Sequence, residues 1–192
     1  MVYIDCDIDR MDLSAAMASV SPQRRSHALR YRQERDQRRS LAAYRLLQHA
    51  LNEEYGITEP PLFDFGANGK PFIVGHPEIH FNLSHCNEAA ACVVSHVPVG
   101  IDVESLNHYD EEIAEKVMNS DEQRQIASSS DPSLAFIRLW TMKESLLKMV
   151  GDGLAEDLRG VLNEYHGLHK GDYTFQTTIY NGFVCTVCAL NK

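Results

Sequence analysis

The chain has few cysteines, one tryptophan and no long apolar run. Its five cysteines form an odd, sparse set that is typical of free thiols in a reducing compartment, not of a disulfide framework. No stretch of eighteen apolar residues occurs, which excludes a transmembrane helix. The N-terminus meets an acid after four residues and has no basic segment, so we expect no secretory signal. These absences favour a cytoplasmic protein with no membrane partner.

The composition suits a compact enzyme, because 44% of the residues are hydrophobic. A chain of 192 residues could form one domain or two small ones. The net charge is −9, yet eight of the 18 basic residues are arginines between Arg24 and Arg45. A locally cationic segment on an acidic protein favours a polyanionic small molecule or an acidic protein partner. The overall acidity and the lack of interleaved aromatic residues argue against nucleic acid. A solvated helix face is the alternative for these arginines.

Two acidic signals about forty residues apart carry the most information. The first is the run Val99–Glu104, which reads as a strand and therefore projects Asp102 and Glu104 from the same face, roughly 7 Å apart. The second lies on an expected helix, where Glu144 and Lys148 are four residues apart and share one face. Together they predict a site for a divalent cation and the phosphates bound to it.

The ligand types favour one class of metal. Three carboxylates without histidine or cysteine suit Mg²⁺, with Mn²⁺ as the alternative, because these ions prefer oxygen ligands. Lys143 and Lys148 supply cationic donors for phosphate oxygens. Two simpler interpretations stay open, namely that Asp102 and Glu104 form a solvated strand face and that Glu144 and Lys148 form a surface ion pair.

The pattern of apolar residues, caps and turns predicts a mixed α+β fold. Helices are expected where capping signals and helical spacing coincide, over 21–31, from there to Tyr55, over 110–118, from Ser120 onward behind a capping box, and over 133–150. Strands are expected over 2–8, 62–65, 71–74, 79–83, 89–95, 99–104 and in the last third of the chain. Cys185-x-x-Cys188 falls in an apolar terminal strand, so we interpret both thiols as core residues on opposite faces.

An offset of ninety-five residues hints at an internal duplication. It superposes the helix end at Tyr55-Gly56 on Val150-Gly151 and the strand at 89–95 on the terminal strand. We therefore expect a pseudo-twofold pair of α/β subdomains, 1–98 and 99–192, with the active site in the cleft between them. The alternative is one mixed domain in which the register is accidental.

Four ordered motifs resemble the Sfp-type 4′-phosphopantetheinyl transferases, over roughly residues 20 to 155. They are Gly69-Lys-Pro71, Phe81-Asn-Leu-Ser-His85, Gly100-Ile-Asp-Val-Glu104, and Trp140 through Lys148 followed by Gly151-Asp-Gly-Leu154. The resemblance implies a pseudo-dimeric fold and a magnesium-dependent enzyme. Such an enzyme moves the 4′-phosphopantetheine arm of coenzyme A to a serine of an acyl or peptidyl carrier protein and releases adenosine 3′,5′-bisphosphate.

The resemblance also implies roles for single residues. Asp102, Glu104 and Glu144 would bind the metal, and Glu144, directly or through a bound water, would take the serine proton with Lys148 as its catalytic partner. The residues implied for coenzyme A are Arg24, Arg38, Lys70, Pro71, Ser84, His85, Lys143 and Lys148. Cys86 and His27 depart from the serine and lysine that are common in the family, which puts the affinity for coenzyme A in doubt.

Two other functions remain open at this point. One is a module that binds coenzyme A or a carrier without turnover, and the other is a magnesium-dependent phosphohydrolase that cleaves coenzyme A-like nucleotides. The sequence does not identify the carrier, whose choice we expect to depend on the surface around 110–130. Because a fused pseudo-dimer has less need of a second chain, we expect a monomer.

Overall fold

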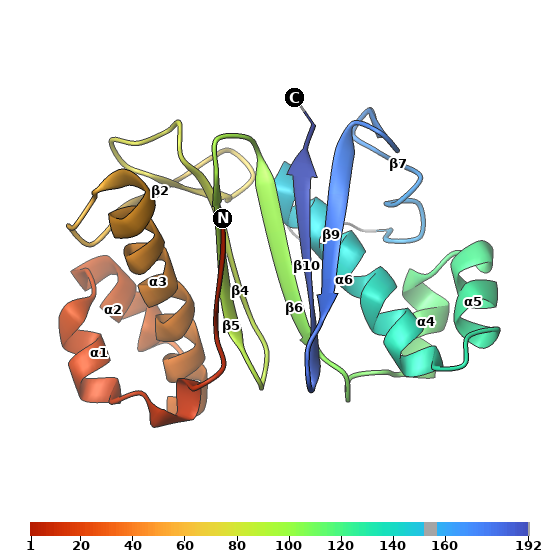
Figure 1. Cartoon of the computed structure of the whole chain (residues 1–192), viewed down its shortest axis with the longest axis horizontal. Helices are drawn as coiled ribbons and strands as arrows, with labels where there is room; N and C mark the ends of the chain where they lie inside the picture. Colours follow the sequence, from red (N-terminus) through yellow and green to blue (C-terminus); the bar gives the residue numbers. More distant parts are fainter. Residues whose placement is uncertain (152–156, 192) are drawn as a thin grey trace.

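The computed structural model describes residues 1–151 and 157–191, which form two halves, each with a three-stranded antiparallel sheet and one long helix (Figure 1). The N-terminal half contains β1 (Val2–Asp5), η1 (Ile8–Arg10), α1 (Leu13–Ser19), α2 (Pro22–Ala28), α3 (Glu34–Tyr55), β2 (Phe63–Phe65), β3 (Pro71–Ile73), β4 (His80–His85) and β5 (Ala90–Ser95). The C-terminal half contains β6 (Val99–Ser105), α4 (Glu111–Val117), α5 (Ser120–Ala127), α6 (Pro132–Val150), β7 (Glu164–Tyr165), β8 (Leu168–His169), β9 (Tyr173–Ile179) and β10 (Phe183–Leu190). This mixture of helix and sheet confirms the α+β class.

Local capping signals set the ends of the helices. The Ser21 side chain accepts a hydrogen bond from the backbone of Arg24, and Pro22 occupies the first helical position of α2. Gly56 ends α3 at φ 67° and Gly151 ends α6 at φ 95°, a left-handed conformation that favours glycine. The other residues of the predicted turn, 152–154, lie outside the described residues.

Several predicted boundaries are wrong, among them the end of the helix expected over 21–31, which stops at Ala28. The first strand stops at Asp5, three residues early, because the chain turns into η1 through hydrogen bonds such as the one from Arg10 N to Asp7 O. The capping box of α5 is made by Asn119 and Glu122, so Ser120 is the first residue of the helix and not its cap.

The two sheets pack against each other, and the long helices cover their outer faces (Figure 1). Ala91 and Val93 of β5 share one buried cluster with Ile101 of β6 and Cys185 of β10. Cys188 lies in a different cluster with residues of α6, which confirms that the two thiols are buried on opposite faces of β10. The halves therefore share a central core in addition to the core under each helix.

The two halves follow the same chain path. The strand orders are β1-β5-β4 and β6-β10-β9, so in each half the last strand lies in the middle and the first strand pairs with it. A two-stranded hairpin, β2-β3 or β7-β8, follows each long helix. The ends of α3 and α6 are separated by the ninety-five residues expected from the sequence. None of the described helices is both long enough and apolar enough to span a membrane.

Candidate active site

A glycine brings the acidic strand close to the helix that carries Glu144. A side chain on Gly100 of β6 would overlap the backbone oxygen of Ser145 and the backbone nitrogen of Met149 in α6. Because side chains alternate along a strand, Asp102 and Glu104 project from the same face of β6 as Gly100. The close contact at Gly100 therefore places α6 beside both carboxylates.

Asp102 is held by residues from both halves of the chain. Lys148 Nζ of α6 lies 2.6 Å from Asp102 Oδ1, and the Ser84 hydroxyl of β4 donates to the same oxygen at 3.0 Å. Ser84 Oγ accepts from Val103 N at 3.2 Å and from Lys148 Nζ at 3.2 Å. The Asp102 side chain is only 7% exposed, so these are charge-assisted hydrogen bonds in a largely dry site.

Glu144 shares this environment with the other two predicted carboxylates. Burial raises the pKa of Glu144, the charge of Asp102 raises it further, Lys148 opposes the shift, and Glu104 adds a smaller increase. Among the described residues, no donor reaches Asp102 Oδ2 or Glu144 Oε1, although both atoms are buried. Buried carboxylate oxygens without a partner are costly unless a cation or a proton compensates them.

Glu104, the third predicted metal ligand, has hydrogen-bond partners of its own. Its Oε1 atom accepts from Ser105 N at 3.0 Å and lies 2.5 Å from Nδ1 of His108. Within the described part of the chain, no group of three or more His, Cys, Asp and Glu side chains is arranged to hold a metal. In this structure His108 and a local amide contact the third carboxylate, so the three-carboxylate metal site stays a prediction.

The donors that are present nevertheless fit a hard divalent cation. Asp102 Oδ2 and Glu144 Oε1 are buried oxygens without a hydrogen bond in the described structure. The charges of Asp102 and Glu104 both raise the pKa of Glu144, and Asp102 has the larger effect. Oxygen ligands of this kind suit Mg²⁺ or Mn²⁺ better than a soft metal.

A cavity of about 310 Å³, which we call the basic pocket, lies in the N-terminal half near this acidic site. Its lining includes Arg24, His27, Tyr31, Phe65, Pro71 and His85. Burial lowers the pKa of His85, and Lys148, Arg39 and Arg24 lower it further. Lys148 therefore links the two regions, since it also binds Asp102.

Arg24 lies in the wall of the basic pocket, where it is partly fixed. Its Nη2 atom bonds the backbone and the hydroxyl of Ser40, at 2.7 Å for the hydroxyl, and its guanidinium lies 5.4 Å from the centre of the Tyr44 ring. Arg24 Nε is buried, and no acceptor among the described residues reaches it. A donor of this kind suits an anionic ligand.

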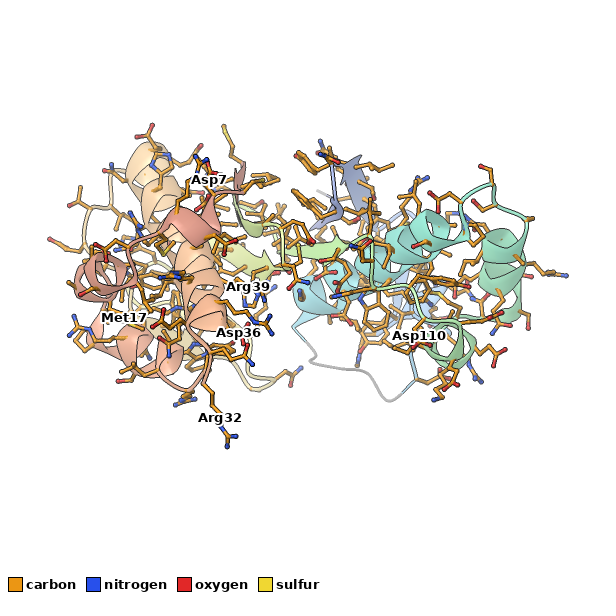
Figure 2. All side chains as sticks on the ribbon, turned by 90° about the horizontal axis from the view of Figure 1, so that it is seen from below. Asp7, Met17, Arg32, Asp36, Arg39 and Asp110 are labelled. Atoms are coloured by element: carbon orange, nitrogen blue, oxygen red, sulfur yellow. The ribbon has the colours of Figure 1, made fainter. Side chains whose placement is uncertain are left out.

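Arg38 is not a residue of this pocket. Its side chain bonds the backbone oxygen of Met11 at 3.2 Å and pairs with Glu34, beside a separate cavity on α1 and α3. Arg39, the next residue, pairs with Asp36 at 3.1 Å, and its charge lowers the pKa of His85. Figure 2 shows Arg39 and Asp36 on the side of α3 that faces the C-terminal half. A one-residue step turns a helix by about 100°, which separates the two arginines.

The two other predicted lysines lie elsewhere. Lys143 is fully buried, with Nζ 2.9 Å from Glu122 Oε2 and 2.7 Å from Leu158 O, so it ties α6 to α5 and is not available to a phosphate. Lys70 Nζ donates to the backbone oxygens of Val99 and Met149, at 3.1 and 2.7 Å, and not into the basic pocket. Both differences arise from tertiary contacts that the sequence does not show.

Glu104 lines a second cavity of about 400 Å³, which we call the aromatic pocket. Tyr109, Ile113, Phe136 and Trp140 line it together with His108. Trp140 stacks on Phe136 with 6.1 Å between ring centres and also packs in two core clusters, which fits its expected role as an anchor beside the site.

Sequence reasoning missed Arg39, Ser40 and His108. Ser40 and Ala43 line the basic pocket three residues apart, and this helical spacing could have indicated which face of α3 borders the pocket. No sequence signal marks His108, whose contact with Glu104 depends on the path of the loop after β6.

Two family models cover most of the chain. One is described as the 4′-phosphopantetheinyl transferase superfamily and matches residues 98–188. The other is described as 4′-phosphopantetheinyl transferase, N-terminal, and matches residues 8–97. A 4′-phosphopantetheinyl transferase of Aneurinibacillus migulanus, gsp, is 31% identical over 201 residues, which covers 98% of this chain and 84% of the relative. The chain belongs to the 4′-phosphopantetheinyl transferase superfamily.

Other relatives within this superfamily give the same result. The transferase psf-1 of Bacillus pumilus is 36% identical over 142 residues, which covers 72% of this chain but only 61% of the relative. The transferase Sfp of Bacillus subtilis strain 168 is 28% identical over 157 residues, 80% of this chain and 70% of the relative. The family membership expected from the four motifs is therefore confirmed.

Proposed function

We propose that the chain transfers the 4′-phosphopantetheine group of coenzyme A to a serine of an acyl or peptidyl carrier protein. The observation that carries the proposal is the position of Lys148, whose Nζ atom lies 2.6 Å from Asp102 and 3.2 Å from the hydroxyl of Ser84, the residue between Leu83 and His85 of the basic pocket. One side of the site suits a cation and the other suits a polyanion, and a pyrophosphate bridging them would meet Lys148. The names of the relatives support this reaction.

In this proposal the basic pocket takes the nucleotide end of coenzyme A. Arg24 and Arg39 supply positive charge for its phosphate groups, and Phe65 and Pro71 supply apolar surface for the base. His85, whose pKa is lowered in the free protein, would gain a proton more readily beside a bound phosphate. Ser84, which the resemblance implied as a contact of coenzyme A, would instead hold Asp102 and Lys148 in place.

The carboxylates are proposed to hold Mg²⁺, or Mn²⁺, through Asp102 Oδ2 and Glu144 Oε1. Glu104 would join them after it releases His108. When bound, such an ion neutralises the charge of the pyrophosphate and polarises the phosphorus under attack.

The chain's own residues would then move the proton and the charge. The serine oxygen of the carrier forms a bond to the phosphorus that bears pantetheine, and the bond to the adenosine-side phosphate breaks. Glu144 accepts the serine proton, directly or through a water, and its raised pKa suits a general base. Lys148 neutralises the departing adenosine 3′,5′-bisphosphate.

We further propose that residues 1–98 and 99–192 are two duplicated subdomains with the active site in the cleft between them. The matching strand orders and the contacts of Ser84 with Asp102 and Lys148 support this proposal. We infer a monomer, because the halves already share a core, and a cytoplasmic location, because all five cysteines are free thiols.

The test is an incubation of the protein with carrier protein, coenzyme A and Mg²⁺, read by mass spectrometry of the carrier. We expect the carrier to gain the mass of one phosphopantetheine group. The rate of this modification should fall at least about a hundredfold in Glu144→Gln and stay unchanged in the exposed control Glu59→Gln. Cleavage of coenzyme A without a carrier would support a phosphohydrolase instead. Binding of coenzyme A without any product would support a non-catalytic module.

A further inference from the structure

The ammonium group of Lys70 joins the two halves at the end of the helix that carries Glu144 and Lys148. Lys70 lies in the connection between β2 and β3, and its Nζ atom donates to Met149 O at 2.7 Å and to Val99 O at 3.1 Å. Met149 is in the last turn of α6, and Val99 is the first residue of β6. One side chain of the N-terminal half thus holds both elements that carry the acidic site.

The contact at α6 is physically favourable. The last four carbonyl oxygens of a helix have no partner within the helix, and the C-terminal end carries a partial negative charge. A lysine ammonium satisfies both requirements.

Gly151 lets the side chain approach the end of the helix. A Cβ atom at this glycine would lie 3.0 and 3.1 Å from Cδ and Cβ of Lys70. The glycine that ends α6 therefore leaves space for the lysine stem as well as adopting a left-handed conformation.

Lys70 is also adjacent in sequence to a residue of the basic pocket. The next residue, Pro71, lines the pocket, while the Lys70 side chain turns away to the C-terminal half. Two titratable groups interact electrostatically with Lys70. Cys188 of β10 raises the pKa of Lys70, and Lys70 lowers the pKa of His80 in β4. Burial lowers the pKa of Lys70 to about 8, so the ammonium form predominates at neutral pH.

We propose that Lys70 is a positioning residue that sets α6 and β6 against the basic pocket, and not a ligand of the nucleotide. The proposal rests on the proposed transfer reaction. It predicts that the loss of the ammonium group lowers kcat, because Glu144 and Lys148 shift, while the affinity for coenzyme A stays nearly constant.

The experiment compares Lys70→Met, Lys70→Arg and the exposed control Lys170→Met. Lys70→Met should lower kcat at least about tenfold, since small displacements of catalytic groups are costly, and should change the Kd for coenzyme A by less than about threefold. Lys70→Arg keeps a cation and should recover part of kcat. A rise in Kd of about tenfold or more with unchanged kcat would overturn the proposal, because it would make Lys70 a nucleotide contact.

Amide hydrogen exchange provides a measurement that needs no turnover. In Lys70→Met the amides of the last turn of α6 should exchange faster than in the unchanged protein, whereas exchange in α3 should not change. Equal exchange in α6 would overturn the positioning role even if kcat falls. Failure of the unchanged protein to modify any carrier would contradict the proposed function, and the exchange result would still decide the role of Lys70.

Discussion

At the scale of single residues, lysines of similar sequence context have different environments in this protein. Lys143 and Lys148 lie on the same helix, yet Lys143 is fully buried against Glu122 and Lys148 is 29% exposed beside Asp102. Both ion pairs lie within the C-terminal half, but Ser84 of the N-terminal half contacts both members of the second pair. Only Lys148 can therefore contribute to both the acidic site and the basic pocket.

This difference predicts that substitution by methionine lowers stability at Lys143 and weakens coenzyme A binding at Lys148. Lys143→Met leaves the buried Glu122 carboxylate without its cationic partner and should lower the free energy of unfolding by about 3–5 kcal/mol, with an unchanged Kd for coenzyme A in the folded protein. Lys148→Met should raise that Kd at least about tenfold. Urea unfolding and calorimetry measure both quantities. Equal weakening of coenzyme A binding by the two variants would contradict the assignment of Lys143 to the core.

His85 predicts a dependence of stability on pH. Burial, and then Lys148, Arg39 and Arg24, lower its pKa below the value of 6.5 in the unfolded chain. As the pH falls through 6.5 and on to the folded pKa, the unfolded chain takes up the proton first, so His85 lowers the free energy of unfolding in that range.

Replacing His85 by Asn should therefore reduce the loss of stability between pH 7.5 and pH 5.5, an interval of about two units around the ordinary histidine pKa. Urea unfolding at the two values measures the effect, with the exposed His169→Asn as control. The account fails on this point if His85→Asn and the unchanged protein lose the same stability.

At the scale of elements, the contact between β6 and α6 depends on the missing side chain of Gly100. Gly100→Ala would place a methyl group against the backbone of Ser145 and Met149, and backbone atoms cannot turn aside as a side chain can. The strand and the helix would have to separate, which would also displace Asp102 from Lys148.

We expect Gly100→Ala to lower the free energy of unfolding by about 3 kcal/mol or more and to weaken coenzyme A binding. Gly160→Ala is the matched control, because a Cβ there meets nothing within 4 Å. Denaturant unfolding of both variants is the measurement. Equal stabilities would show that β6 and α6 do not approach as closely as described.

Local patterns were sufficient for most elements and for part of the site. Ser21, Gly56 and Gly151 mark helix ends through short-range caps, and strand alternation places Asp102 and Glu104 on one face. These features depend on neighbouring residues only, so the sequence shows them directly.

The remaining features depend on contacts between distant segments. Which side chains of α3 face the basic pocket, Ser40 and Ala43 among them, depends on how this helix is rotated against its sheet. The burial of Lys143 depends on Glu122 of α5, and the position of Glu104 depends on His108. No local pattern contains this information.

At the scale of the whole molecule, the two halves are joined by apolar packing as well as by polar contacts. Val93 and Ile101 belong to one buried cluster, and Asn82 of β4 accepts a hydrogen bond from Ile101 N at 2.9 Å. Domains that share a core of this kind are expected to unfold together.

The shared core predicts a single unfolding transition. Trp140, the sole tryptophan, reports on the C-terminal half, while circular dichroism reports on both halves. The two signals should change at the same urea concentration. Separate midpoints would show that each half unfolds independently, which the packing between the sheets does not allow.

The central claim is that carboxylates on β6 and α6 hold one divalent cation beside the basic pocket. Calorimetric titration with Mn²⁺ in the presence of coenzyme A tests it most directly. We predict one site, weakened at least about tenfold in both Asp102→Asn and Glu144→Gln and unchanged in Glu59→Gln. Equal Mn²⁺ affinity in all four proteins would contradict the claim.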